Sequence, residues 1–77
     1  MGHLADAETA TTQALTLLEP GLRRSHAYYS VQLAELQLAQ GNTTDARTTA
    51  AAIDTTHVGS RAITGRLATV HRTLAAA

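Results

Sequence analysis

Histidine is the residue type in this 77-residue chain with the clearest chemical potential, because imidazole binds metal ions and exchanges protons near neutral pH. Asp54 and His57 lie three residues apart on a predicted helix, so they could offer an oxygen and a nitrogen to one ion. A metal site needs further ligands, and His26 and His71 belong to no second paired motif. We therefore expect no bound metal. His57 is then explained by a position near a helix C-terminus, where positive charge is favourable, and His26 and His71 by boundary or surface positions.

Ser25 and His26 resemble a nucleophile beside its base, but they are adjacent in the sequence. Neighbouring side chains on a helix point about 100 degrees apart, so this pair cannot share a proton. The chain also has no cysteine and no glycine-rich phosphate loop. The sequence therefore predicts a protein that is not an enzyme and uses no cofactor.

Arginines on the last helical segment, residues 61–75, raise the possibility of DNA binding. A short turn precedes this segment, as it would precede a recognition helix. Arg61 and Arg72 share one side of the predicted helix, whereas Arg66 falls at the flank of its apolar stripe. The formal net charge of the chain is +0, without the basic excess of a nucleic-acid binder. A small DNA-binding domain therefore stays the alternative function.

Composition restricts the chain further. Tyr28 and Tyr29 are the only aromatic residues, while alanine and threonine are abundant, so we expect a thin core of closely spaced helices. No apolar stretch reaches the roughly 20 residues that span a bilayer, and no secretion signal precedes the first helix. With the lack of cysteine, this predicts a soluble cytoplasmic protein without membrane partners.

Four segments follow the 3.6-residue period of an α-helix: 4–18, 23–40, 43–56 and 61–75. The first has one apolar stripe and ends at Glu19-Pro20-Gly21. The second is apolar on two nearly opposite sides, which is typical of a helix packed between neighbours. The third has a narrow stripe of small residues. The fourth has one apolar face, which suits a terminal capping helix and comprises Ile63, Leu67, Val70 and Leu74.

Turn residues separate these segments. Gly41 can adopt the left-handed conformation that ends a helix, and Asn42 can cap the next one in a box with Asp45. The second and third segments should therefore pack as an antiparallel hairpin. Ser60 is the expected N-cap of the fourth segment.

Residues 27–54 resemble a tetratricopeptide repeat, with Leu33-Ala34 at its characteristic pair, Gly41 at its turn glycine and Ala46 at a small position. Residues 6–20 resemble the second helix of a preceding repeat. The run from Ala14 to Leu74 further resembles the C-terminal end of tetratricopeptide-like regions in helix-turn-helix transcriptional regulators of high-GC bacteria. Such regions finish in a Gly-Ser-Arg segment and an arginine-containing helix, as residues 59–61 do here.

This resemblance implies an all-α, antiparallel helix-hairpin array in a single module, residues 1–77. Residues 4–18 would be the second helix of a preceding repeat, 23–57 one helix-turn-helix repeat and 60–75 the capping helix. The implied function is a non-enzymatic protein or peptide interaction module, as the C-terminal fragment of a bacterial transcriptional regulator or signalling protein. Its DNA-binding part would lie upstream.

In such arrays the first helix of each repeat lines a groove, so the resemblance implies partner-binding residues at Tyr28, Val31, Glu35 and Leu38. Val31 and Leu38 have an alternative role in packing against a neighbouring helix. One and a half hairpins fall short of the roughly three repeats that an independent array needs. The first 22 residues carry three acids and no arginine, and residues 58–77 carry three arginines and no acid. We therefore expect self-association or packing against the remainder of a longer chain.

Overall fold

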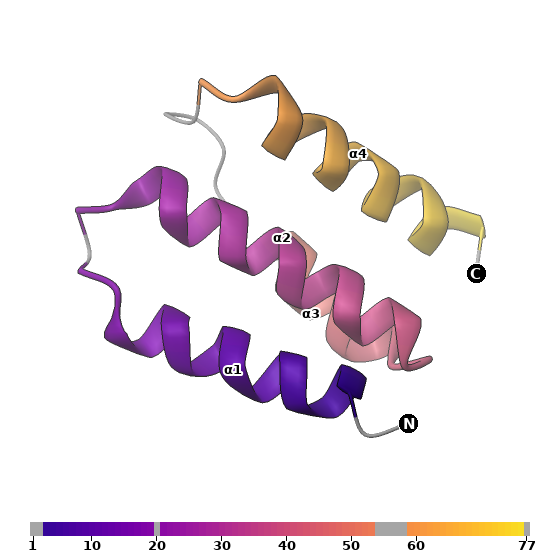
Figure 1. The fold of residues 1–77 in the computed structure, drawn as a ribbon. Coiled ribbons are helices and arrows are strands. Elements are labelled where there is room, and N and C mark those ends of the chain that lie inside the picture. The colour runs from indigo at the N-terminus through magenta and orange to yellow at the C-terminus, as the bar shows by residue number, and fades with distance from the viewer. Residues whose placement is uncertain (1–2, 20, 54–58, 77) are drawn as a thin grey trace.

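The computed structural model describes residues 3–19, 21–53 and 59–76, and within these ranges the chain is helical without strands (Figure 1). The all-α prediction with about four helices is confirmed. No helix in the described part is long and apolar enough to cross a membrane. The four helices are α1 (His3–Leu17), α2 (Arg23–Ala39), α3 (Thr43–Ala51) and α4 (Arg61–Ala76).

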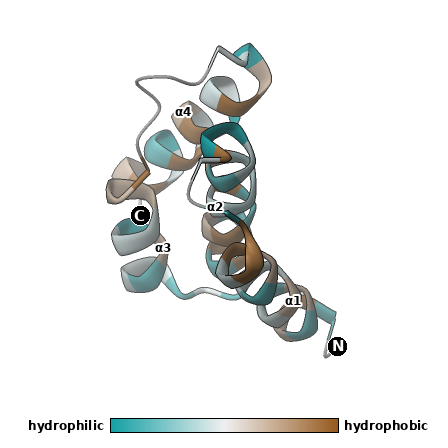
Figure 2. Cartoon of the chain, turned by 90° about the vertical axis from the view of Figure 1, so that its left-hand side faces the viewer, coloured by the Kyte–Doolittle hydropathy of each residue, from teal (hydrophilic) through white to brown (hydrophobic). Residues whose placement is uncertain are grey.

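Helix α2 lies at the centre of the molecule. It contacts the other three helices, whereas α1 packs only against α2 among the described residues, and α4 packs against α2 and α3. Figure 2 shows α2 between α1 on one side and α3 on the other. The prediction that the two-sided apolar helix packs between neighbours is confirmed.

Two hydrogen bonds establish how α2 runs relative to α1. The Gln32 amide donates to the Thr11 hydroxyl at 2.9 Å, and the Gln40 amide donates to the Glu8 carboxylate at 2.7 Å. Gln40, at the C-cap of α2, thus pairs with the earlier residue of α1 and Gln32 with the later one, so the two helices run in opposite directions. In Figure 1, α4 runs in the same direction as α2.

The hydrophobic core is formed by α2, α3 and α4. Where α2 meets α3 the buried residues are mostly alanines, and small side chains allow close approach of helix backbones. Helix α4 supplies the larger side chains, all from its predicted apolar face, while the opposite face is exposed. The buried apolar residues are Ala27, Val31, Ala34, Ala46, Ala50, Ile63, Leu67, Val70 and Leu74.

Helix α1 contributes no residue to this core. Its one buried side chain is that of Thr11, and Leu15 and Leu18 on the same stripe are only half-buried. Leu17 is 84% exposed. The joint between α1 and α2 therefore depends on polar side chains and partly covered leucines.

The turn between α2 and α3 is closed by backbone hydrogen bonds. Gly41 has a φ of 81°, as predicted, and its N–H donates to the Leu38 carbonyl at 3.0 Å. The Asn42 N–H donates to the Gln37 carbonyl at 2.8 Å, which completes a Schellman motif. Asn42 occupies the N-cap position of α3, but its side chain makes no capping hydrogen bond. The predicted capping box is wrong, because Asn42 has a ψ of 66° rather than the extended value that aims a cap side chain at the helix.

Helix α3 ends at Ala51, earlier than the predicted end near residue 56. The Ala52 N–H donates to the carbonyls of both Thr48 and Thr49, and the Ile53 N–H donates to that of Ala50 at 3.2 Å. The bonds to Thr49 and Ala50 each reach back three residues, as in a 3₁₀-helix. Such bonds tighten the last turn of an α-helix and end it. Ile53 still packs against the core from this turn, so its place in the apolar stripe did not require a longer helix. Asp54 and His57 lie outside the described residues.

Candidate functional site

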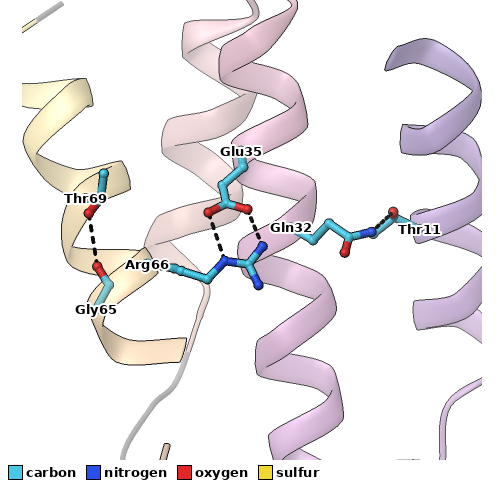
Figure 3. Close-up of polar contacts among 6 residues, drawn as sticks. All are labelled: Thr11, Gln32, Glu35, Gly65, Arg66 and Thr69. Carbon is cyan, nitrogen blue, oxygen red and sulfur yellow. Dashed lines mark hydrogen bonds and ion pairs between the residues drawn. The ribbon is translucent and has the colours of Figure 1, made fainter. Parts of the chain in front are cut away.

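The surface where α2 and α4 lie side by side carries an ion pair between Glu35 and Arg66 (Figure 3). The Arg66 Nε donates to Glu35 Oε2 at 3.0 Å, and its Nη2 donates to Oε1. Both side chains are 36% exposed. This two-point contact joins α4 to α2 at the edge of the core.

Tyr28 lies on the same side of α2, two helical turns before Glu35. The Arg66 guanidinium carbon is 5.3 Å from the centre of the Tyr28 ring, close enough for a cation–π interaction. The rings of Tyr28 and Tyr29 meet edge to face, with centres 5.2 Å apart and planes at 77°. Hydrogen bonding to Glu35 raises the pKa of Arg66 above its ordinary value, against the opposing effect of burial. Arg66 is therefore a permanent cation at this surface.

A hollow of about 360 Å³ lies beside these residues, where α2 and α4 begin. Ser60 caps α4 at its edge, since the Ser60 Oγ accepts a hydrogen bond from the Ile63 N–H at 3.4 Å; this confirms the predicted N-cap. The hollow is lined by Arg24, Ser25, Tyr28, Tyr29, Ser60, Ala62, Ile63 and Arg66.

The four residues predicted to contact a partner fall into two groups. Tyr28 is 41% exposed, and Glu35 reaches the surface through its pair with Arg66. Val31 is fully buried, and Leu38 is half-buried against the core. For Val31 and Leu38 the structure matches the alternative of packing against a neighbouring helix, because both lie on the side of α2 that faces the core.

The sequence alone did not identify Arg66, Arg24 or Tyr29 as parts of a common site. The one signal for Arg66 was its position at the flank of the apolar stripe, where an arginine is half-buried and can reach a neighbouring helix. Nothing local in the sequence indicated that this neighbour would present Glu35.

The candidate metal and catalytic residues do not converge. The Nε2 of His26 forms a 3.1 Å hydrogen bond with the backbone carbonyl of Glu19, His71 is exposed, and Ser25 lines the hollow. The described residues contain no group of three or more histidines and acids placed to hold a metal ion. The pair of Asp54 and His57 falls outside them.

The three arginines of α4 lie on different sides of the helix, as their spacing in the sequence predicted. Arg61 and Arg72 are exposed, and Arg72 donates to the Thr69 hydroxyl on its own helix at 3.1 Å. Arg66 is engaged with Glu35, so a nucleic acid would have to compete for it.

No protein-family model matches the chain, and neither curated proteins nor solved structures show significant similarity to it.

Proposed function

We propose that this chain is a non-enzymatic interaction module that binds a protein or peptide segment on the face shared by α2 and α4. The observation that carries the proposal is Tyr28, which is partly exposed yet held by the Arg66 guanidinium and the Tyr29 ring. A pre-ordered tyrosine loses little conformational entropy on binding, and tyrosine and arginine are enriched among the residues that dominate binding energies. Glu35 adds a carboxylate for polar contacts beside them.

The packing order of the helices supports a tetratricopeptide-like array as the scaffold. Helices α2 and α3 would form one repeat, and α4 lies against both, as the first helix after a repeat would. Among the described helices, α1 lies against α2 alone, which fits the second helix of a preceding repeat. The exposed Leu17 on α1 supports a further neighbour, from the remainder of a longer chain or from a second copy. In this proposal the module belongs to a cytoplasmic bacterial regulator or signalling protein.

Selection from a random peptide library displayed on phage tests the proposed function. The full chain serves as bait, and enriched peptides are synthesised and measured by fluorescence polarisation. Tyr28→Ser should weaken their binding by about thirtyfold or more, because loss of an anchoring tyrosine costs roughly 2 kcal/mol or more.

Leu17→Ser is the matched control, since it also removes an exposed apolar side chain but lies on α1, away from the proposed face. Its peptide affinity should equal that of the unchanged protein. Failure to enrich any peptide, or equal affinity of the Tyr28→Ser variant, would overturn the proposal.

A further inference from the structure

The hollow between the starts of α2 and α4 has the composition of a small-molecule site. Its volume of about 360 Å³ lies in the range of ligand pockets, roughly 300 to 1,000 Å³. The rings of Tyr28 and Tyr29 and the side chains of Ala62 and Ile63 provide apolar and aromatic surface. Ile63 is itself a buried core residue, so this part of the lining is firmly held. A flat apolar ring would find matching contacts here.

The charges around the hollow select the kind of polar group that the ligand should carry. Two guanidinium groups line it, but Glu35 compensates that of Arg66. Arg24 has no hydrogen-bond or ion-pair partner among the described residues. Its Nη2 lies 3.9 Å from where a Cβ would stand on Gly59, so the guanidinium reaches from α2 to the segment before α4. One uncompensated positive charge matches one negative charge on the ligand.

We propose that this hollow binds a small aromatic monocarboxylate, with its ring against Tyr29 and Ile63 and its carboxylate on the guanidinium of Arg24. An arginine holds a carboxylate through two parallel N–H···O bonds. Ser25 also lines the hollow, and its hydroxyl would donate a further hydrogen bond to the carboxylate. A phosphate dianion would bring a second negative charge, and the described residues that line the hollow offer no second free cation for it. The site goes beyond protein or peptide binding and does not depend on it.

The ligand probe is 3-phenylpropionate, and its neutral counterpart 3-phenylpropionamide has the same shape without the charge. Both are titrated into the full-length chain while backbone amide signals are followed by ¹H–¹⁵N NMR. The acid should shift the signals of Ser25, Tyr29 and Ile63. The amide should bind about tenfold or more weakly, since a hydrogen bond to a charged group contributes about 1.5 to 3 kcal/mol.

Arg24→Gln should reduce the affinity for the acid to that for the amide. Arg72→Gln is the matched control, because it removes an exposed arginine from α4 outside the hollow and should leave the affinity unchanged. Equal binding of acid and amide overturns the proposal even if Arg24→Gln fails to fold. Shifts confined to other helices, absence of binding, or full affinity of Arg24→Gln would also overturn it. None of these results bears on Tyr28-dependent peptide binding, which the phage selection measures separately.

Discussion

Glu35 and Arg66 join α2 to α4 through two charge-assisted hydrogen bonds, and a double-mutant cycle can measure what this pair contributes to stability. Each side chain is about one-third exposed, so water screens the attraction strongly. Exposed pairs contribute about 0.2 to 1 kcal/mol, and the two-point geometry places this pair in the upper part of that range. We expect a coupling free energy of about 0.5 to 1 kcal/mol.

The cycle compares the unchanged protein with Glu35→Gln, Arg66→Gln and the double variant by thermal unfolding, followed by circular dichroism at low salt. For a domain of this size, 1 kcal/mol corresponds to roughly 4 to 8 °C in Tm. Glu35→Gln should therefore lower the Tm by about 2 to 8 °C. Arg66→Gln should lower it further, because this variant also loses the cation–π contact with Tyr28.

Salt and pH provide two further checks on the pair. The coupling should shrink in 1 M NaCl, because the Debye length there falls to about 3 Å, comparable to the separation of these partly exposed charges. The pKa of Arg66 is raised in the folded protein, so its stabilising effect is complete below the unfolded-state pKa of arginine and is lost only at higher, strongly alkaline pH. Arg72→Gln, which removes only a contact within α4, should change the Tm little. A coupling of zero at low salt, or one that salt does not reduce, would refute the reasoning.

Two further predictions concern the backbone and the core, and thermal or urea unfolding tests both. Gly41→Ala should destabilise the protein by about 1 to 2 kcal/mol, because φ is positive there, and no crowding contributes. Gly65→Ala within α4 should instead stabilise it by about 0.5 to 1 kcal/mol. Changes of the same sign in the two variants would contradict this account. Val31→Ala should cost about 2 kcal/mol or slightly more, from two buried methyl groups and the cavity that they leave. Leu17→Ala should stay within about 0.5 kcal/mol, and equal losses for the two variants would show that Val31 is not in the core.

The helices and the buried face of α4 could be predicted from the sequence because both depend on local spacing. Ile63, Leu67, Val70 and Leu74 recur at the helical period, and all four are buried. Gly41 was equally predictable, since few residues other than glycine adopt its positive φ. The end of α3 was not predictable, because alanine and threonine continue through it without a stop signal.

The candidate site could be predicted only in part. Tyr28 and Glu35 follow from their positions on the first helix of the proposed repeat, but their partner Arg66 lies 31 residues after Glu35. That contact depends on how far α4 slides along α2, which the packing of the whole core decides. Val31 and Leu38 follow nearly the same helical spacing as Tyr28 and Glu35. The sequence therefore could not predict which of the four residues would face the surface and which would pack in the core.

Because the contact between α1 and α2 is largely polar, α1 and the core of α2, α3 and α4 differ in how much free energy it takes to unfold them locally. Thr11 and Gln32 can exchange their mutual hydrogen bond for water at little cost, while the core of α2, α3 and α4 stays intact. We therefore expect helix α1 to detach at a lower free energy than global unfolding requires. When α1 detaches, it uncovers the side of α2 against which it packed. The α1 of a second copy would fit there with the same contacts, which is the arrangement of a domain-swapped dimer.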